Sequence, residues 1–167
     1  MAYSDKFIAT DTLITRLNPI IATVIDPDVR NSYAGLLSVS AITAYELAIK
    51  EICIAFSEKK HKVFGTVMEA HFSRLNGRIK YSALRGEIIK PFGKNYLDRF
   101  DNKMKRIERL KLTGPTHVSA IAQYDNLIQC RHGFVHGGNI LLTPNEVIQA
   151  FSNGKDIIHC LHSSMVR

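Results

Sequence analysis

The chain lacks several features that would assign it to a specialised class of protein. Its 167 residues include no tryptophan and only three cysteines, Cys53, Cys130 and Cys160, which stand among apolar neighbours without any Cys-x-x-Cys pair. An odd number of cysteines without that spacing argues against a disulfide framework and against a zinc ribbon. We therefore expect three buried, reduced thiols.

Long apolar runs are also missing. No stretch approaches the roughly 18 consecutive apolar residues that indicate a membrane span. The first residues, MAYSDKFIATDTL, carry acids early and lack the apolar core of a signal peptide. We therefore expect a cytoplasmic protein that does not associate with membranes. Since 46% of the residues are apolar, the composition is that of a globular chain, and the length predicts a single domain over residues 1–167.

Positive charge is concentrated in one part of the chain. The segment from Arg74 to Lys111 contains 12 Lys/Arg and 4 Asp/Glu, whereas the remaining residues contain 10 and 11 of these types. A localised basic segment is typical of proteins that bind a polyanion such as RNA. The alternative is a solvated basic face without a ligand.

Apolar residues recur at spacings of three and four along most of the chain, which is the period of an amphipathic helix. This pattern predicts helices over residues 6–25, 29–58, 63–76, 96–110 and 117–131, and a last helix from residue 144 through residue 161. Residues 78–97 are interrupted by Gly86, Pro91 and Gly93, so we expect short helical turns and loops there. No segment alternates with a period of two. The prediction is an all-α bundle of about five to seven helices.

Several residues mark the ends of these helices. Pro19 is expected to break or kink the first helix. Asp28 is the predicted N-cap of the second helix, because it follows Asp26-Pro27 and precedes the apolar pattern. Thr143 and Glu146 have the spacing of a capping box.

The second helix is apolar on nearly all sides between residues 33 and 56, which is typical of the centre of a bundle or of an oligomer interface. Glu46 lies within this stretch. A buried carboxylate destabilises the fold unless it has a partner. Lys50 follows one turn later, so the two residues form either an ordinary ion pair on the helix or part of a site.

Residues 130–138 read CRHGFVHGG, in which Arg131 and His136 are separated by four residues. This segment resembles the R-x4-6-H motif of the HEPN superfamily (higher eukaryotes and prokaryotes nucleotide-binding domain), and in particular its stand-alone RiboL-PSP-type or defence-associated members. Glu46-x3-Lys50 is similar to a second feature of that superfamily, an E-x3-K/R pair on an earlier core helix. His132 stands where the superfamily commonly has asparagine or another polar residue. The resemblance implies a four- to five-helix bundle with the motif at the junction after a core helix.

The resemblance also implies a metal-independent endoribonuclease of the transphosphorylation type, without a cofactor. His136 would be the general acid or base, Arg131 would hold the scissile phosphate, and Glu46 and Lys50 would assist them as further catalytic residues. Histidine exchanges protons near neutral pH, and the arginine guanidinium matches the geometry of a phosphate. The candidate substrate-binding residues are His132, Arg74, Arg78 and Lys80. His132 is also a candidate second proton carrier, provided that its ring does not point away from His136.

Members of the superfamily resemble one another in forming dimers whose two motifs meet across a shared cleft, so the resemblance implies a homodimer. It also implies RNA as the substrate and a toxin or phage-defence role restrained by an antitoxin or another regulatory partner. Gly138 stands where the toxins paired with nucleotidyltransferase antitoxins have tyrosine, two residues after the histidine, which argues against that particular partner.

Other interpretations of the same residues stay open at this point. The chain is alternatively a non-catalytic HEPN module that dimerises or binds nucleotides, or a helical protein whose basic face binds acidic partners. His132-x3-His136 and His159-x2-His162 have spacings compatible with metal ligands on a helix. Arg131 is otherwise a helix-end arginine that pairs with the helix dipole or with Asp125, and His136 is otherwise a turn histidine that caps a carbonyl.

Overall fold

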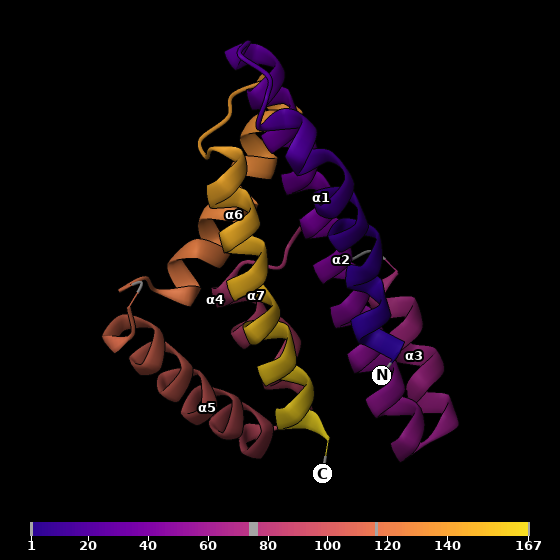
Figure 1. The fold of residues 1–167 in the computed structure, drawn as a ribbon. Coiled ribbons are helices and arrows are strands. Elements are labelled where there is room, and N and C mark those ends of the chain that lie inside the picture. Colours follow the sequence, from indigo (N-terminus) through magenta and orange to yellow (C-terminus); the bar gives the residue numbers. More distant parts are fainter. Residues whose placement is uncertain (1, 74–76, 116, 167) are drawn as a thin grey trace.

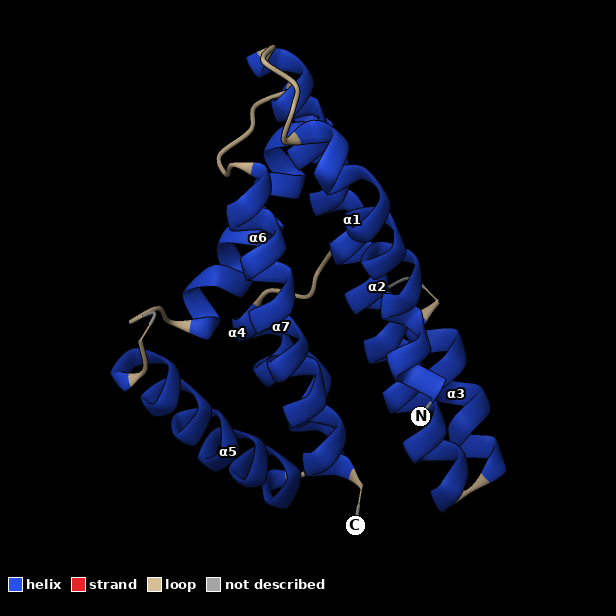
Figure 2. Ribbon diagram, in the orientation of Figure 1, coloured by secondary structure: helices blue, strands red, loops and turns tan. Residues whose placement is uncertain are grey.

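The computed structural model describes residues 2–73, 77–115 and 117–166 (Figure 1). All regular structure in these ranges is helical, and Figure 2 shows helices joined by short loops, which confirms the all-α prediction. In chain order the elements are η1 (Ala2–Phe7), α1 (Ile8–Ile21), α2 (Pro27–Lys60), α3 (Lys62–Phe72), α4 (Tyr81–Ala83), η2 (Leu84–Ile89), η3 (Lys90–Phe92), α5 (Lys94–Thr113), α6 (Ala120–Gly137) and α7 (Pro144–Met165). The elements η1 and η3 are 3-10 helices, and η2 is a π-helix.

The long helix α2 forms the centre of the bundle, as its apolar pattern predicts. It packs against η1, α1, α3, α6 and α7. Its fully buried side chains include Leu37, Ala41, Tyr45, Ala48 and Ile49. Figure 1 shows α1 lying along α2 and α7 lying between α2 and α5, so α5 is an outer helix.

The ends of the early helices differ from the prediction in detail. Asp28 is not the N-cap of α2; the Asp26 carboxylate accepts a hydrogen bond of 2.8 Å from the Asp28 N–H. The reason is that Pro27 takes the first helical position, where its missing N–H is harmless, so the residue before it becomes the cap. Pro19 does not stop α1, which continues to Ile21. The predicted end of the third helix, at residue 76, lies outside the described residues.

The later predictions are confirmed more closely. Thr143 and Glu146 form the capping box of α7, in which the Thr143 N–H donates to the Glu146 carboxylate at 2.8 Å. The three cysteines are buried. Residues 81–92 consist of short helical turns, because α4, η2 and η3 follow one another there, whereas the last residues of the predicted segment belong to α5, which begins at Lys94.

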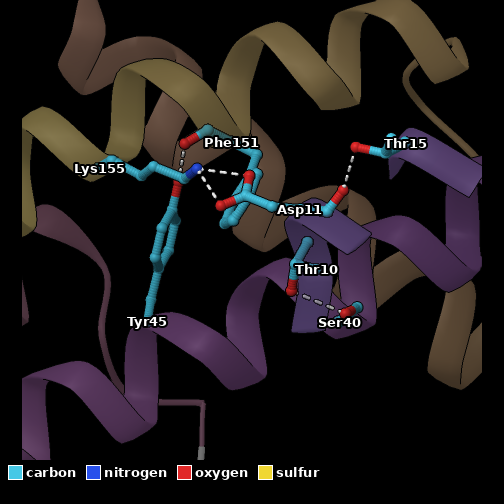
Figure 3. A network of polar contacts seen from close by, with 7 residues as sticks. All are labelled: Thr10, Asp11, Thr15, Ser40, Tyr45, Phe151 and Lys155. Atoms are coloured by element: carbon cyan, nitrogen blue, oxygen red, sulfur yellow. Dashed lines mark hydrogen bonds and ion pairs between the residues drawn. The ribbon is translucent and has the colours of Figure 1, made fainter. Parts of the chain in front are cut away.

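A network of polar contacts joins α1, α2 and α7 (Figure 3). The Lys155 ammonium contacts both oxygens of Asp11 at 2.6 and 2.8 Å. The Tyr45 hydroxyl donates to the Phe151 carbonyl at 2.5 Å, and burial holds the pKa of Tyr45 well above its ordinary value. The phenol therefore stays protonated and acts as a buried donor.

The segment after α3 is held against α6 by two hydrogen bonds. The Tyr124 hydroxyl donates to the Ile79 carbonyl at 2.7 Å, and the Tyr81 N–H donates to the Asp125 carboxylate at 2.9 Å. These bonds bring Arg78 and Lys80 alongside the helix that carries the motif.

In the part of the chain that the structure describes, no helix is long and apolar enough to span a membrane.

Candidate active site

The R-x4-H segment lies inside α6 rather than after it. The helix begins at the Ser119 cap, whose hydroxyl accepts from the Ala122 N–H at 3.0 Å, and it ends at Gly138, where φ is +66°. The prediction that the helix ends near residue 131 is therefore wrong. A tertiary contact stabilises the extra turns, because the Phe134 ring packs directly on Gly35 of α2.

The helical geometry decides which side chains of the motif lie together. Because successive residues turn by about 100°, the Cα–Cβ directions of Arg131 and His136 differ by about 140°. His132 and His136 are one turn apart, and their ring centroids lie 4.5 Å from each other with an angle of 50° between the planes. The ring of His132 therefore faces His136 and meets the geometric condition for a second proton carrier.

Arg131 and Glu46 approach each other at Gly77. The Gly77 N–H donates to the Glu46 carboxylate at 2.6 Å. A Cβ atom at Gly77 would lie 3.7 Å from the Arg131 Nη1 atom, so the guanidinium reaches the same backbone turn. The φ angle of Gly77 is +73°, a conformation that side chains with a Cβ disfavour. A glycine at this position thus lets the turn connect the two helices.

The two ion pairs that were alternatives to a site role, Glu46 with Lys50 and Arg131 with Asp125, do not form among the described residues. Glu46 makes no ion pair with Lys50, since its carboxylate accepts from the backbone of Gly77 instead. Asp125 accepts from the Tyr81 N–H and makes no ion pair with Arg131. The half-buried guanidinium of Arg131 is consequently available to an external anion.

A groove of about 480 Å³ runs beside the last turns of α6. Its walls are formed by one face of α6, the turn before α4 and the loop after α6, with the lining residues Gly77, Lys80, Ile128, Gln129, His132, Gly133, Asn139 and Leu141. His136 does not line the groove, but its ring contacts that of His132, which does. The groove thus contains an ammonium group and one imidazole, and the second imidazole lies next to the first.

The other predicted site residues do not all lie at the groove. Lys50 is half-buried on α2 and does not line the groove, and Arg78 is exposed next to Gly77. Arg74 lies outside the described residues. Gln129 and Asn139 line the groove although the motif does not include them. The helical period places Gln129 near His132, whereas no pattern in the sequence indicates that Asn139 folds back beside Gly133.

Among the described residues, no group of three or more His, Cys, Asp or Glu side chains is placed to hold a metal ion. His159 and His162, which have ligand-like spacing, instead contact Tyr3. The Tyr3 hydroxyl lies 2.9 Å from the His159 Nδ1 atom, and the Tyr3 ring stacks on His162.

Comparison with known proteins identifies the family. The model of the RiboL-PSP-HEPN family matches residues 5–167, a range that includes Glu46 and the whole segment from Arg131 to His136. No curated protein and no solved structure matches the chain. Because the family match extends over nearly the whole sequence, the chain belongs to the RiboL-PSP-HEPN family of HEPN domains.

Proposed function

We propose that the protein is a metal-independent endoribonuclease in which His132 and His136 transfer the two protons. The observation that carries this proposal is the 4.5 Å separation of the two rings beside a groove that also contains Lys80. In the proposed reaction, the 2′-OH of RNA attacks the adjacent phosphorus and the bond to the 5′-oxygen breaks. One imidazole takes the proton from the 2′-OH, and the other gives a proton to the leaving 5′-oxygen. The products are a 2′,3′-cyclic phosphate and a 5′-OH.

The remaining charges of the site suit the phosphate. Arg131 presents a planar, cationic fork of donors, and Lys80 adds a second cation at the groove wall. Stabilisation of charge at phosphorus by a preorganised donor is typically worth two to three orders of magnitude in rate. Glu46 is a positioning residue in this scheme, because it holds the Gly77 turn against which the guanidinium lies.

A second copy of the chain is part of the proposal. Arg131 and His136 diverge by about 140° along α6, so a phosphate bound by Arg131 of one protomer is expected to meet His136 of its partner. Leu36 and Val135, which follow Gly35 and Phe134 in the chain, have apolar side chains that are 47% and 49% exposed. Exposed apolar side chains next to the motif are candidates for a homodimer interface.

The experiment that tests the nuclease is cleavage of a labelled RNA in EDTA by wild type, by His132→Ala and by His136→Ala. We expect each variant to lose about 10²–10⁴-fold in rate, the range of general acid–base catalysis, without a change in melting temperature. His71→Ala, which alters an exposed histidine of α3, is the matched control and should retain full activity. Cleavage that survives both site variants would refute the assignment.

The dimer is tested by light scattering. Leu36→Asp combined with Val135→Asp is expected to give a monomer with reduced cleavage at low protein concentration, because two buried charges would oppose the interface. Leu110→Asp, on the outer helix α5, should leave the mass unchanged. A wild-type protein that is already monomeric would contradict a shared cleft.

We further propose a toxin or defence role that a regulatory protein partner restrains, as the resemblance of the motif to stand-alone HEPN proteins implies. Expression of wild type is then expected to arrest growth of a host cell, whereas His136→Ala should not. Equal growth with both proteins would argue against toxicity, and RNA binding without cleavage would favour a non-catalytic HEPN module.

A further inference from the structure

A second and larger groove, of about 770 Å³, lies between η2, α5 and α6. Its rim carries the cations Arg85, Lys105 and Arg109, and its floor includes Met104 and Ile121. We propose that this groove binds the single strand of RNA that extends away from the scissile phosphate. The inference rests on the proposed function and adds to it a substrate longer than the two nucleotides that cleavage itself requires.

The basic residues of α5 divide into two sets, and only one of them serves the fold. The Lys103 ammonium donates to the Ser163 carbonyl at 2.6 Å, and Lys111 pairs with Asp156 at 2.8 Å, so both tie α5 to α7. The side chains of Lys105 and Arg109, in contrast, are exposed and form no ion pair or hydrogen bond with the other described residues, although the charge of Lys105 helps Arg85 to lower the pKa of Asp101. Their charges are therefore available to a ligand.

The two acids of the groove are already engaged. Asp101 is bound by two parallel hydrogen bonds of 2.7 Å from Arg85, and this guanidinium lowers the pKa of the Asp101 carboxyl below its ordinary value. Glu108 accepts from the Ile121 N–H at 2.8 Å. Asp101 is thus neutralised by Arg85, and Glu108 is bound to the backbone of α6. Lys105 and Arg109 therefore determine the electrostatic potential at the solvent-exposed rim of the groove.

The two grooves lie along the same face of α6. Ile121 lines the second groove, Ile128 and His132 line the first, and Asp125 falls between them at helical spacing. Eleven residues of helix correspond to about 16 Å, which a single strand covers in a few nucleotides. Lys80 and Tyr81, adjacent in the chain, each line one of the two grooves.

The chemistry of the lining favours a nucleic acid strand. Cations at the rim suit the phosphates, whereas an apolar floor and the half-buried ring of Tyr81 suit the faces of bases and sugars. Single-stranded binding sites in proteins combine these two components. Because phosphate contacts release counterions, the affinity should depend steeply on salt.

The test compares wild type with the double variant Lys105→Ala/Arg109→Ala on a 20-nucleotide RNA and on a dinucleotide. We expect KM for the long RNA to rise about tenfold with kcat unchanged, because two phosphate contacts are lost. Cleavage of the dinucleotide should not change. The salt dependence of binding, measured as the slope of log K against log salt, should fall by about 1.4, or 0.7 for each contact. The charge-matched control Arg16→Ala/Lys62→Ala removes two exposed cations outside the basic segment and should behave as wild type.

Binding of the same RNA to His136→Ala proteins, with and without the groove substitutions, separates this inference from the nuclease assignment. A tenfold loss of affinity supports the groove even if no RNA is cleaved. Cleavage by wild type combined with unchanged affinity and KM in the double variant would overturn the groove and leave the nuclease intact. Unchanged RNA affinity with lost binding of a polyglutamate peptide would also overturn it, because the groove would then serve an acidic protein.

Discussion

Two regions of the bundle differ in whether their charged side chains have a protein partner. The first, the matched region, is the contact of α1 and α2 with α7 around Tyr45. The second is the groove beside the last turns of α6. In the first region the Lys155 ammonium contacts both oxygens of Asp11 and lies 4.4 Å from the centre of the Phe151 ring (Figure 3). In the second region Arg131 and Lys80 make no ion pair with any described residue.

The difference shows which polar groups stabilise the fold and which are available to a ligand. A polar group that is partly removed from water and has a protein partner contributes to the native state, and its loss leaves the partner unsatisfied. A cation without a partner adds little to stability, so its removal should affect binding and catalysis instead. The two regions can therefore be separated by measuring stability and activity on the same variants.

Among the variants that compare the two regions, the largest effect is expected from Arg131→Gln. This change removes the cation beside Gly77 and should lower kcat by about 10²–10³-fold, as for other preorganised donors, while the melting temperature stays within about 2 °C of wild type. Lys155→Gln removes a cation from the matched region and should do the reverse. It should lower the melting temperature and leave kcat unchanged. Cleavage assays and thermal unfolding of both variants check the pair.

An Arg131→Gln protein whose melting temperature falls by several degrees while kcat stays normal would contradict this comparison. In that case the guanidinium would stabilise the Gly77 turn rather than contact the substrate.

A smaller effect is expected from Gly154→Ala, which tests the packing of the matched region. A Cβ atom at Gly154 would overlap the hydroxyl and the ring of Tyr45. Overpacking of this kind typically destabilises a protein by about 1–3 kcal/mol. For a chain of this size the melting temperature should fall by about 2–4 °C for each kcal/mol, with the activity of the folded fraction unchanged. Gly86→Ala, at a position with no atoms within 4 Å of the added Cβ, is the control.

The bundle itself follows from local patterns in the sequence. The apolar period predicts the helices, the all-apolar stretch of α2 predicts its central place, and the Thr143–Glu146 spacing predicts the cap of α7. The errors have local causes as well. Asp28 has a residue type suited to capping, but Pro27 moves the cap to Asp26.

The candidate site is predictable only where a motif marks it. Arg131, His132 and His136 are adjacent in the sequence, so the motif identifies them, but the angles between them depend on whether the helix continues. That continuation depends on the contact of Phe134 with Gly35, which lies almost 100 residues away in the chain. The return of Asn139 to the groove is likewise a tertiary contact without a local signal.

The smallest effect concerns Glu146, whose cap holds α7 at the end of the loop that carries Asn139 and Leu141 to the groove wall. Hydrogen bonds from the Thr143 backbone and hydroxyl lower the pKa of the Glu146 carboxyl below its ordinary value. Folding therefore favours the ionised form, so the contribution of this carboxylate to stability is present above the ordinary carboxyl pKa and is lost as the pH falls through the lowered pKa.

Glu146→Gln should reduce the free energy of unfolding by about 0.3–1 kcal/mol at pH 7, the range for a charge at a helix N-terminus. This difference from wild type should vanish in acid, whereas Glu69→Gln, an exposed control on α3, should show none at any pH. Denaturant titrations from pH 7 to pH 3 check both variants, and a difference that does not decrease at all over this range would mean that the glutamate acts through packing rather than charge.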